Sequence, residues 1–504
     1  MSQHPFRWLL RLFLLFSFLG ILGLAAAALA THYLFQEPAQ VTWSRCLLPE
    51  FRWQRQKYPS VRWAFDLVEP FLNASDPRDR FTAGRPIGAL AGPEAWDNAL
   101  AGPRALPPGS PRPSAAVWIQ VASNTELRSA ISAARPGTLI EILPGSYDFS
   151  GGSIDIVHGG EPDLPIRVWA AQPGSVRLRF SLLEGFHVRA PHWIFENLVI
   201  EGTCDNDSRC EHAFHVVGAG SHVVIRNNWV SEFNAAIKVN GRDGRFPDAG
   251  LVEYNALVNS RPRATSNPVT PIDAVAASGW RVRKNLIADF AKAGGDRVSY
   301  GAFFKGAGED NVFEQNVVRC EWQHWGGTRI GFSFGGGGSG SSATHCRDGR
   351  CRVEHRGGIA RNNIIMNCPN DVGIYLNMSA DTRIQNNTLA KTRGIDVRFP
   401  QSDAVIVNNI VDGRILAREG ARISKSDNIE SLLKALFLGK VTDDIYGNAP
   451  QGDFRLKSLD AVQGRGAPVP EGGPDLCGQP YRDGKPDAGP IQHGPQMACV
   501  PLIP

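Results

Sequence analysis

One phrase recurs along this chain: two or three β-forming residues, one or two polar residues ending in Asn, and then two or three apolar residues. Trp193-Ile-Phe-Glu-Asn197-Leu-Val-Ile is the first of eight such segments, and Val405-Ile-Val-Asn-Asn409-Ile-Val is the last. Most of the spacings between them are near 30 residues, and the last two are 24 and 22 residues. A fixed period in this range indicates stacked coils rather than one globular core.

Asparagine suits the corner of such a coil, because it tolerates a left-handed φ and its amide can bond to the next Asn in a stacked column. A coil of three short strands with Asn at one corner is a rung of a right-handed parallel β-helix. The sequence therefore predicts this all-β solenoid fold. The asparagines expected to stack in one column are Asn228, Asn255, Asn285, Asn316, Asn363, Asn387 and Asn409.

The composition fits such a solenoid and narrows the class of partner. The chain has 504 residues, and its 53 glycines and 35 prolines suit many turns between short strands. Its 53 Lys and Arg residues nearly balance 49 Asp and Glu residues, so no polyanionic partner follows from net charge alone, and we expect no nucleic acid. No oligomeric state follows from the sequence.

The N-terminus predicts export. Arg7 and Arg11 precede an apolar run over residues 12–30 that ends Ala-Leu-Ala. Nineteen residues can span a bilayer with the basic flank in the cytoplasm, which predicts a membrane anchor. The same run can be a long signal peptide cut after Ala30. The length favours the anchor, and either way the body lies in the periplasm or outside the cell.

Cysteine usage agrees with export. Pairs that lie close in sequence suggest disulfides in an oxidising compartment. The expected local pairs are Cys204 with Cys210, Cys346 with Cys351, and Cys477 with Cys499. Cys320 and Cys368 follow two corner asparagines at similar distances and can also pair, which leaves Cys46 alone.

We divide the chain into the anchor or signal segment (1–30), a poorly periodic region with a Pro/Gly-rich linker (31–115), the β-helix (116–430) and a C-terminal capping segment (431–504). Ser123-Asn-Thr-Glu126 is a capping box that predicts a short amphipathic helix to about Ala134. That helix would cover the open end of the first coil, as solenoids require.

The order of a helix, Pro-Gly-Thr, a strand, Pro-Gly-x-Tyr and then Asn-cornered rungs resembles the entry of the pectate-lyase-like superfamily. Within that superfamily, the chain is most similar to the chondroitinase B and alginate lyase type of polysaccharide lyase. The resemblance covers roughly residues 117–430. It implies the fold, whereas activity must be argued from the site, because the same coil carries lyases, hydrolases, epimerases and non-catalytic adhesins.

Aligning the rungs on their Asn corners also aligns the strand that opens each coil. Period two then sends the second and fourth residues of each strand outward. One predicted outward column is His215, Lys238, Asp273, Phe303, Ser333, Tyr375 and Asp396. The other is Val217, Asn240, Val275, Lys305, Gly335, Asn377 and Arg398. Aromatic residues can stack on sugars and basic residues can pair with uronate carboxylates, so these columns predict a carbohydrate-binding face.

Long insertions should border that face. They fall at 203–212, 241–249, 260–271, 291–300 and 320–357, and most precede the next opening strand, which predicts that they cluster along one edge. The last insertion contains His324, His345, His355 and cysteines at irregular spacing. Zinc is one alternative there, but disulfides are the preferred interpretation and we predict no metal site.

Lys305 is the sharpest catalytic candidate, because in the lyases that the chain resembles a Lys closes this strand. Those enzymes remove the C5 proton of a uronic acid, and a Lys with a lowered pKa can be the base. The resemblance implies a partner Arg in the next rung, where this chain has Gly335, so Arg329 or Arg398 would have to replace it. It also implies acidic calcium ligands, but only Asp296 stands in the expected segment.

The sequence therefore predicts an exported β-helix that acts on an acidic, uronate-containing polysaccharide by β-elimination. Lys305 would be the base or neutralise the carboxylate, and Arg329 would be its partner. The residues expected to position the sugar are Lys238, Asn240, Asp273, Tyr375, Asn377, Asp396 and Arg398. The alternative is a non-catalytic carbohydrate-binding or envelope-structural β-helix.

Overall fold

The computed structural model describes residues 101–106, 110–336, 339–430, 440–457, 459–469, 472–481 and 484–493. The expected anchor or signal segment, most of the predicted linker and Cys46 lie outside these residues. No helix among the described residues has the length and apolarity needed to cross a bilayer.

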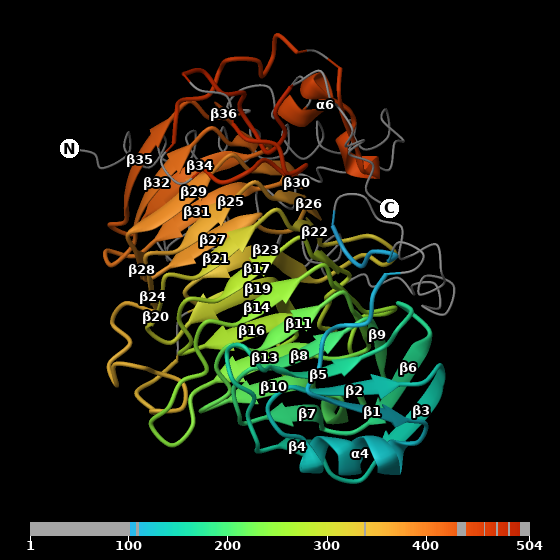
Figure 1. Ribbon diagram of the computed structural model, residues 1–504. Helices are drawn as coiled ribbons and strands as arrows, with labels where there is room; N and C mark the ends of the chain where they lie inside the picture. The colour runs from blue at the N-terminus through green and yellow to red at the C-terminus, as the bar shows by residue number, and fades with distance from the viewer. Residues whose placement is uncertain are drawn as a thin grey trace, which may run out of the picture. The chain divides into compact units, whose positions relative to one another are not determined.

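Three long sheets, stacked in chain order, form the body of the molecule (Figure 1). Successive strands run from the 12-stranded sheet to the 11-stranded sheet and then to the 10-stranded sheet, and each pairs in parallel with its counterpart one coil later. Turns and loops join the strands. This is a parallel β-helix, as the Asn repeat predicted.

Each sheet takes one strand from every coil that it spans. The 12-stranded sheet contains β1 (Val117–Val121), β2 (Thr138–Ile142), β5 (Ile166–Trp169), β8 (Trp193–Glu196), β11 (Val224–Arg226), β14 (Leu251–Glu253), β17 (Arg281–Arg283), β21 (Val312–Glu314), β25 (Ile359–Arg361), β29 (Thr382–Gln385), β32 (Asp403–Val407) and β35 (Arg422–Ser426). The 11-stranded sheet contains β3 (Gly145–Ser150), β6 (Val176–Ser181), β9 (Leu198–Gly202), β12 (Trp229–Ser231), β15 (Ala256–Val258), β18 (Leu286–Ala288), β22 (Val317–Arg319), β26 (Ile364–Cys368), β30 (Thr388–Thr392), β33 (Ile410–Val411) and β36 (Ile429–Glu430).

The strands that open each coil form the 10-stranded sheet, which carries the candidate site. They are β4 (Ile154–Ile156), β7 (Glu184–Val188), β10 (His212–Val217), β13 (Ile237–Asn240), β16 (Ile272–Val275), β19 (Val298–Lys305), β23 (Thr328–Phe334), β27 (Ile374–Asn377), β31 (Gly394–Arg398) and β34 (Arg414–Arg418). A short sheet of β20 (Gly308–Glu309), β24 (His355–Arg356) and β28 (Ser379–Ala380) lies where three of these coils turn.

The core is the interior of the coil. Alternate residues of the opening strands, such as Ile237 and Val239 or Phe332 and Phe334, are fully buried in one continuous apolar cluster. Phenylalanines stack along it, with the ring centroids of Phe313 and Phe332 4.2 Å apart. The predicted inward positions are therefore confirmed.

The asparagine column is confirmed and continues one coil further. The amide group of Asn316 donates to the Oδ1 of Asn363 and to the carbonyl of Val282, while its own Oδ1 accepts from the backbone and side chain of Asn285. The same pattern links every neighbour from Asn228 to Asn428. Four hydrogen bonds to one buried side chain explain why Asn recurs here.

The reason given for Asn at the corner was partly wrong, because the residue before each Asn of the column, and not that Asn itself, has the left-handed φ. Asn227, Tyr254, Lys284 and Gln315 have φ between 55° and 56°. None of the column asparagines from Asn228 to Asn428 has a left-handed φ. Hydrogen bonding, rather than backbone conformation, therefore selects the ladder residue.

The predicted capping helix is present as α4 (Asn124–Ala133). Ser123 Oγ accepts from the backbone N–H of Glu126 at 3.2 Å, and Leu127, Ala130 and Ile131 are buried against the first coil. The helix covers the end of the solenoid beside β1 and β4 (Figure 1).

Among the described residues, disulfides join Cys204 with Cys210, Cys346 with Cys351, and Cys320 with Cys368. These confirm the two local pairs and the suggested third, and they indicate an oxidising compartment outside the cytoplasm. Cys477 is disulfide-bonded, and Cys499, its expected partner, lies outside the described residues.

The described C-terminal residues pack on the outward face of the 11-stranded sheet. They include α6 (Val441–Ile445), β37 (Tyr446–Asn448) and β38 (Asp453–Leu456). Tyr446, Phe454 and Leu476 share an apolar cluster with Trp229 and Ile364 of that sheet. This face is therefore covered by the chain itself.

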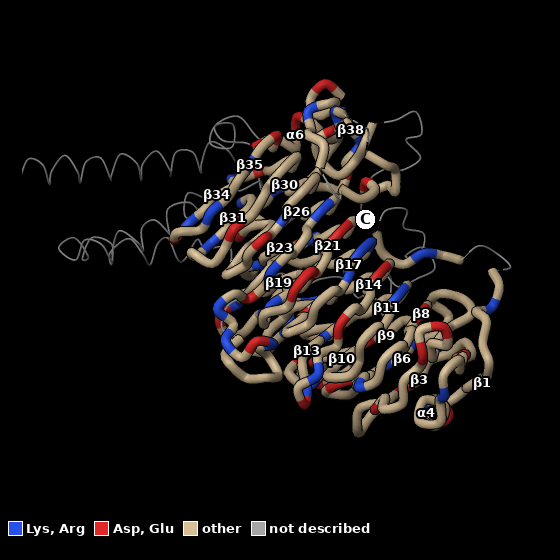
Figure 2. Tube along the Cα trace, turned by 60° about the vertical axis from the view of Figure 1, so that its left-hand side comes forward, with Lys and Arg blue, Asp and Glu red and all other residues tan. Residues whose placement is uncertain are grey.

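The outward face of the 12-stranded sheet carries a column of strictly alternating charge. Glu196, Arg226, Glu253, Arg283, Glu314 and Arg361 occupy successive strands in register. Ion pairs connect neighbours, for example Arg226 to Glu196 at 3.0 Å and Arg283 to Glu253 at 2.8 Å. Figure 2 shows the alternation of blue and red along β11, β14, β17 and β21.

Candidate functional site

The outward columns of the 10-stranded sheet are in the register that the repeat predicted. His215 pairs with Lys238, Lys238 with Asp273, Asp273 with Phe303, and the column continues through Ser333 and Tyr375 to Asp396. In the second column Val217 pairs with Asn240, Val275 with Lys305, and Asn377 with Arg398.

The middle of this face is less open than the sequence suggested. Val275, Phe303 and Ser333 are buried, with exposed fractions of 1%, 6% and 0%. Phe246 and Tyr300 pack over Val275 and Phe303. The polar side chains consequently fall into three groups along the sheet rather than one continuous exposed row.

The long insertions also form two groups, where one edge was expected. Residues from 203–212, 260–271 and 291–300 contact each other, as in the hydrogen bond from Ser208 to Thr265 at 2.8 Å. The 320–357 insertion is divided by β23, and its larger part lies with 241–249 beyond the carboxyl ends of the strands. Arg347 holds it there with two bonds to Asp248 of 2.7 Å each.

We define the lysine group as Lys238 of β13, Asp273 of β16, Lys305 at the end of β19, and His345 of the 320–357 insertion. Lys238 Nζ lies 2.7 Å from Asp273 Oδ2, whereas the buried Oδ1 of Asp273 has no hydrogen-bond partner among the described residues. Lys305 is half-buried, with Nζ 4.8 Å from the centre of the Phe303 ring. No ion pair of Lys305 is found in the described structure.

The surroundings of Lys305 make its uncharged form easier to reach than that of an ordinary exposed lysine. Burial lowers the pKa of Lys305, and the positive charge of Lys238 lowers it further, while Asp273 and Glu354 oppose the shift. Partial desolvation of the ring and the positive charges of Lys238 and Lys305 also lower the pKa of His345. Glu354 is itself occupied, accepting from the backbone of Gly306 and from Ser339.

Arg329, the predicted catalytic partner, is not near Lys305. It pairs in register with Ser299, six residues before Lys305 on β19, which corresponds to about 20 Å of strand. Its side chain is 1% exposed and donates to the carbonyls of Gly326 and Cys320. The expected Arg329–Lys305 partnership is therefore wrong: Arg329 is occupied within the turn that precedes β23.

The position that the resemblance assigns to the partner Arg has no space for a side chain. Gly335 aligns with Lys305 and has a φ of +74°, and a Cβ there would overlap the carbonyl oxygen of Asn377. Arg398, the other predicted partner, is three strands from Lys305, or about 14 Å at the usual strand spacing. Arg398 pairs instead with Glu419, so neither arginine is a partner of Lys305 in this structure.

The residues near Lys305 do not fit the calcium site that the resemblance implies. Asp296, the one acidic candidate, is at the opposite end of β19, where it forms an ion pair with Lys292 and accepts from the backbone of Val298. Lys238 already holds the Asp273 carboxylate. The described residues therefore offer no cluster of free oxygen ligands here.

A second group, Tyr375, Asp396 and Arg398 with Arg418 and Glu419, lies on the last coils. Arg398 pairs with Glu419 at 2.7 Å, and Arg418 Nε donates to Asp396 at 2.9 Å. Tyr375 is 9% exposed and packs with Ile330 and Val372. Of the predicted sugar-positioning residues, Asp396 and Arg398 are therefore already paired, with Arg418 and Glu419 respectively. Asn377 is half-buried, and its Oδ1 has no partner among the described residues.

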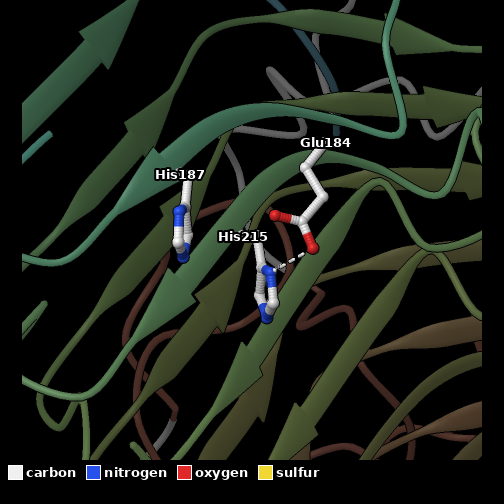
Figure 3. A group of neighbouring side chains, drawn as sticks. All are labelled: Glu184, His187 and His215. Atoms are coloured by element: carbon white, nitrogen blue, oxygen red, sulfur yellow. Dashed lines mark hydrogen bonds and ion pairs between the residues drawn. The ribbon is translucent and has the colours of Figure 1, made fainter. Parts of the chain in front are cut away.

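A third group on the first coils was missed by the sequence reasoning. Glu184, His187 and His215 project from β7 and β10 toward the same point (Figure 3), and one ligand atom from each lies within 4.8 Å of the others. We call these three residues the histidine cluster. Phe186-His187-Val188 and Phe214-His215-Val216 repeat the same tripeptide one coil apart, which is the signal that could have revealed it.

The histidine cluster is partly buried and strongly coupled. The hydrogen bond from His215 lowers the pKa of Glu184 to about 2. Burial lowers the pKa of His187, and burial lowers that of neighbouring His212 to about 4. The rings of His187 and His215 stack with centroids 5.4 Å apart.

Among the described residues of the insertion 320–357, the histidines join no group that could hold a metal ion. Cys346 and Cys351 are bonded to each other, His355 contacts Asn311, and His324 contacts Arg329. Its basic residues are partly neutralised, since Arg347 pairs with Asp248 and Arg356 with Asp381. The disulfide expected within this insertion, Cys346 with Cys351, is therefore confirmed.

Comparison of the sequence with known protein families finds one match. Residues 298–433 match the family described as "Periplasmic copper-binding protein (NosD)", which is less than half of the chain. No curated protein has a similar sequence.

Solved structures of lyases are similar at low identity. Pectate lyase Pel9A is 14% identical, with a TM-score of 0.52 over 75% of this chain and 96% of that one. A PL6 family polysaccharide lyase from Pseudopedobacter saltans is 14% identical with a TM-score of 0.36, covering 62% of this chain and 92% of that one. At this identity the likeness shows the fold alone: the chain has the right-handed parallel β-helix fold of the pectate-lyase-like proteins.

Proposed function

We propose that this is an exported β-helix protein that binds an acidic, uronate-containing polysaccharide on the outward face of the 10-stranded sheet. One observation carries the proposal. Lys238 forms an ion pair with the Asp273 carboxylate, Lys305 and His345 lie within electrostatic reach of it, and it keeps one buried oxygen without a partner.

A sugar acid matches what this group lacks. Its carboxylate can take a charge-assisted hydrogen bond from Lys305, which has no ion pair among the described residues. Its hydroxyl groups can donate to the unpartnered oxygens of Asp273 and Asn377 on the same face. A neutral sugar would leave Lys305 unpaired, so an acidic one is favoured.

The binding test compares the wild type with Lys305→Met and Lys238→Met against polygalacturonate and alginate, by calorimetry. Losing a charge-assisted hydrogen bond should weaken binding about 10-fold or more. Lys425→Met on the 12-stranded sheet is the matched control, because it removes the same charge from a 40% exposed side chain that pairs with Glu430. Equal losses in all three variants would indicate general attraction and refute a site.

Catalytic β-elimination is the second candidate, and the lowered pKa of the half-buried Lys305 favours it. The neutral amine would take the C5 proton, the electron pair would form the C4–C5 double bond, and the oxygen at C4 would leave. Lys238 or His345 would have to neutralise the uronate carboxylate, because Arg329 is remote and Gly335 has no side chain.

Ultraviolet absorbance separates the two candidates, because elimination creates an unsaturated uronate. A lyase should lose about 10²-fold or more of its turnover in Lys305→Ala, the scale of one general acid–base group. Uronate polymers that bind tightly without any absorbance increase would leave the binding function and refute the catalytic one.

A further inference from the structure

We infer that Glu184, His187 and His215 form a binding site for a divalent transition-metal cation of the zinc type, separate from the lysine group. Two imidazole nitrogens and one carboxylate oxygen are a ligand set that such ions use, with an open position left for water or a ligand. This inference does not depend on the proposed polysaccharide function.

The hydrogen bonds around His187 leave the correct atom available. Its Nδ1 lies 2.8 Å from Asp155 Oδ1 and must donate to that carboxylate, so the neutral ring carries its lone pair on Nε2. That lone pair now faces Arg242 Nη1 at 3.5 Å, and the Arg242 side chain is 46% exposed and free to move aside. A carboxylate behind a metal-binding histidine is the usual means of fixing its orientation.

His215 is held in a similar way from the other side. Its Nε2 lies 2.7 Å from Asn240 Oδ1, and Asn240 Nδ2 donates to the carbonyl of Gly241, which fixes the amide with its oxygen toward the ring. The ring therefore donates from Nε2. Its Nδ1 then faces Glu184 Oε1 at 2.9 Å, and two lone pairs at this distance require a cation between them. That cation is either a proton or a metal ion.

The three ligand atoms need only a small closure to share one ion. They lie within 4.8 Å of one another, and two ligands at zinc bond lengths are at most about 4.2 Å apart. Glu184 and the two histidines have side chains 24%, 15% and 16% exposed, so they can shift and an ion can enter from solvent. His212, Lys238 and Arg189 are the other basic groups nearby, and none is one of the three ligands.

The test uses tag-free, full-length protein that has been stripped with a chelator and titrated with zinc chloride by calorimetry. We expect about one equivalent to bind per chain, and Co²⁺ in the same site should give a visible ligand-field spectrum. His187→Gln and His215→Gln should each weaken zinc binding at least about 100-fold, and Asp155→Asn should weaken it about 10- to 100-fold.

His158→Gln is the matched control, because His158 is exposed on the turn after β4 and is outside the cluster. Zinc binding that is unchanged in His187→Gln and His215→Gln, or absent from the wild type, would overturn the inference. If a variant fails to fold, anomalous diffraction at the zinc edge from wild-type crystals decides: a peak between the three side chains supports the site, and a peak elsewhere or none refutes it.

Discussion

The charged columns on two faces of the same coil follow opposite rules. On the 12-stranded sheet Glu196, Arg226, Glu253, Arg283 and Glu314 alternate in sign, so every charge has an opposite neighbour one strand away. On the 10-stranded sheet the column from β4 to β16 reads Asp155, His187, His215, Lys238 and Asp273. Three basic residues there stand in succession between two carboxylates.

This difference separates structural polar groups from candidate functional ones. In a parallel stack the same column repeats about every 4.8 Å, so like groups repel unless their signs alternate. In the first column the signs alternate, so its charges neutralise one another. In the second column they do not, and it is where the unpartnered Asp273 oxygen and the close His215–Glu184 contact occur. Unbalanced charge in a repetitive fold thus points to the face that meets ligands.

The largest expected effect comes from breaking the alternating column at its centre. Glu253 is 3% exposed and accepts from both Arg226 and Arg283, so Glu253→Gln leaves Arg283 without its charged partner and Arg226 with Glu196 alone. We expect the free energy of unfolding to fall by about 3 kcal/mol, measured by chemical denaturation. Polyuronate binding should be unchanged.

Glu201→Gln is the control for that variant, since Glu201 and its partner Arg177 are both 30% exposed. It should cost less than about 1 kcal/mol. Equal effects in the two variants would show that alternation along the column contributes nothing beyond single ion pairs.

A smaller loss is expected when the corresponding carboxylate of the other face is removed. Asp273→Asn keeps an oxygen acceptor for Lys238 and relieves the desolvation of an unpartnered oxygen, so the loss should be about 1 kcal/mol. Because Asp273 raises the pKa of Lys305, the variant should lower that pKa further. Lys305 would then react with an acylating reagent at lower pH than in the wild type; an unchanged profile would contradict the proposed coupling.

The sequence was sufficient for the fold because the fold repeats. Each ladder Asn is selected by the same hydrogen bonds, so spacing alone fixed the coil, the register and the inward positions of residues such as Ile237 and Phe332. Outward residues carry no such constraint. Strand register placed Lys238 next to Asp273 correctly.

The site was less predictable, because the repeat period specifies neither how the insertions pack nor how deeply a side chain is buried. Arg329 was expected beside Lys305 on sequence proximity to β23, but it is at the far end of the strand and buried in a turn. The burial of Phe303 depends on Phe246 from another insertion, which no local pattern reveals. The histidine cluster was predictable, and it was missed because the column was started one coil too late.

A pH-dependent effect should distinguish the histidine cluster from the alternating column. The folded pKa of Glu184 is about 2, below its ordinary value of 4.5, because His215 donates to it. A depressed carboxyl pKa contributes stability that is present above about pH 4.5 and is lost as pH falls toward 2. Glu184→Gln should therefore flatten the stability profile between these values. The Glu201→Gln profile should match the wild type; a flattened profile there would mean that the effect is general.

The smallest effect is expected on the last coils, where the charged residues of the 10-stranded sheet already form ion pairs. Arg398 is 35% exposed and pairs with Glu419, and Asp396 pairs with Arg418, so each charge already has an exposed partner. Arg398→Ala should leave the unfolding midpoint unchanged, because exposed ion pairs contribute little. It should also weaken polyuronate binding by less than about 2-fold, since its charge is already neutralised. Calorimetry on Arg398→Ala and Lys305→Met in parallel measures this difference in polyuronate binding. A loss in Arg398→Ala as large as that in Lys305→Met would extend the binding face over the last coils and break the distinction between paired and unpaired columns.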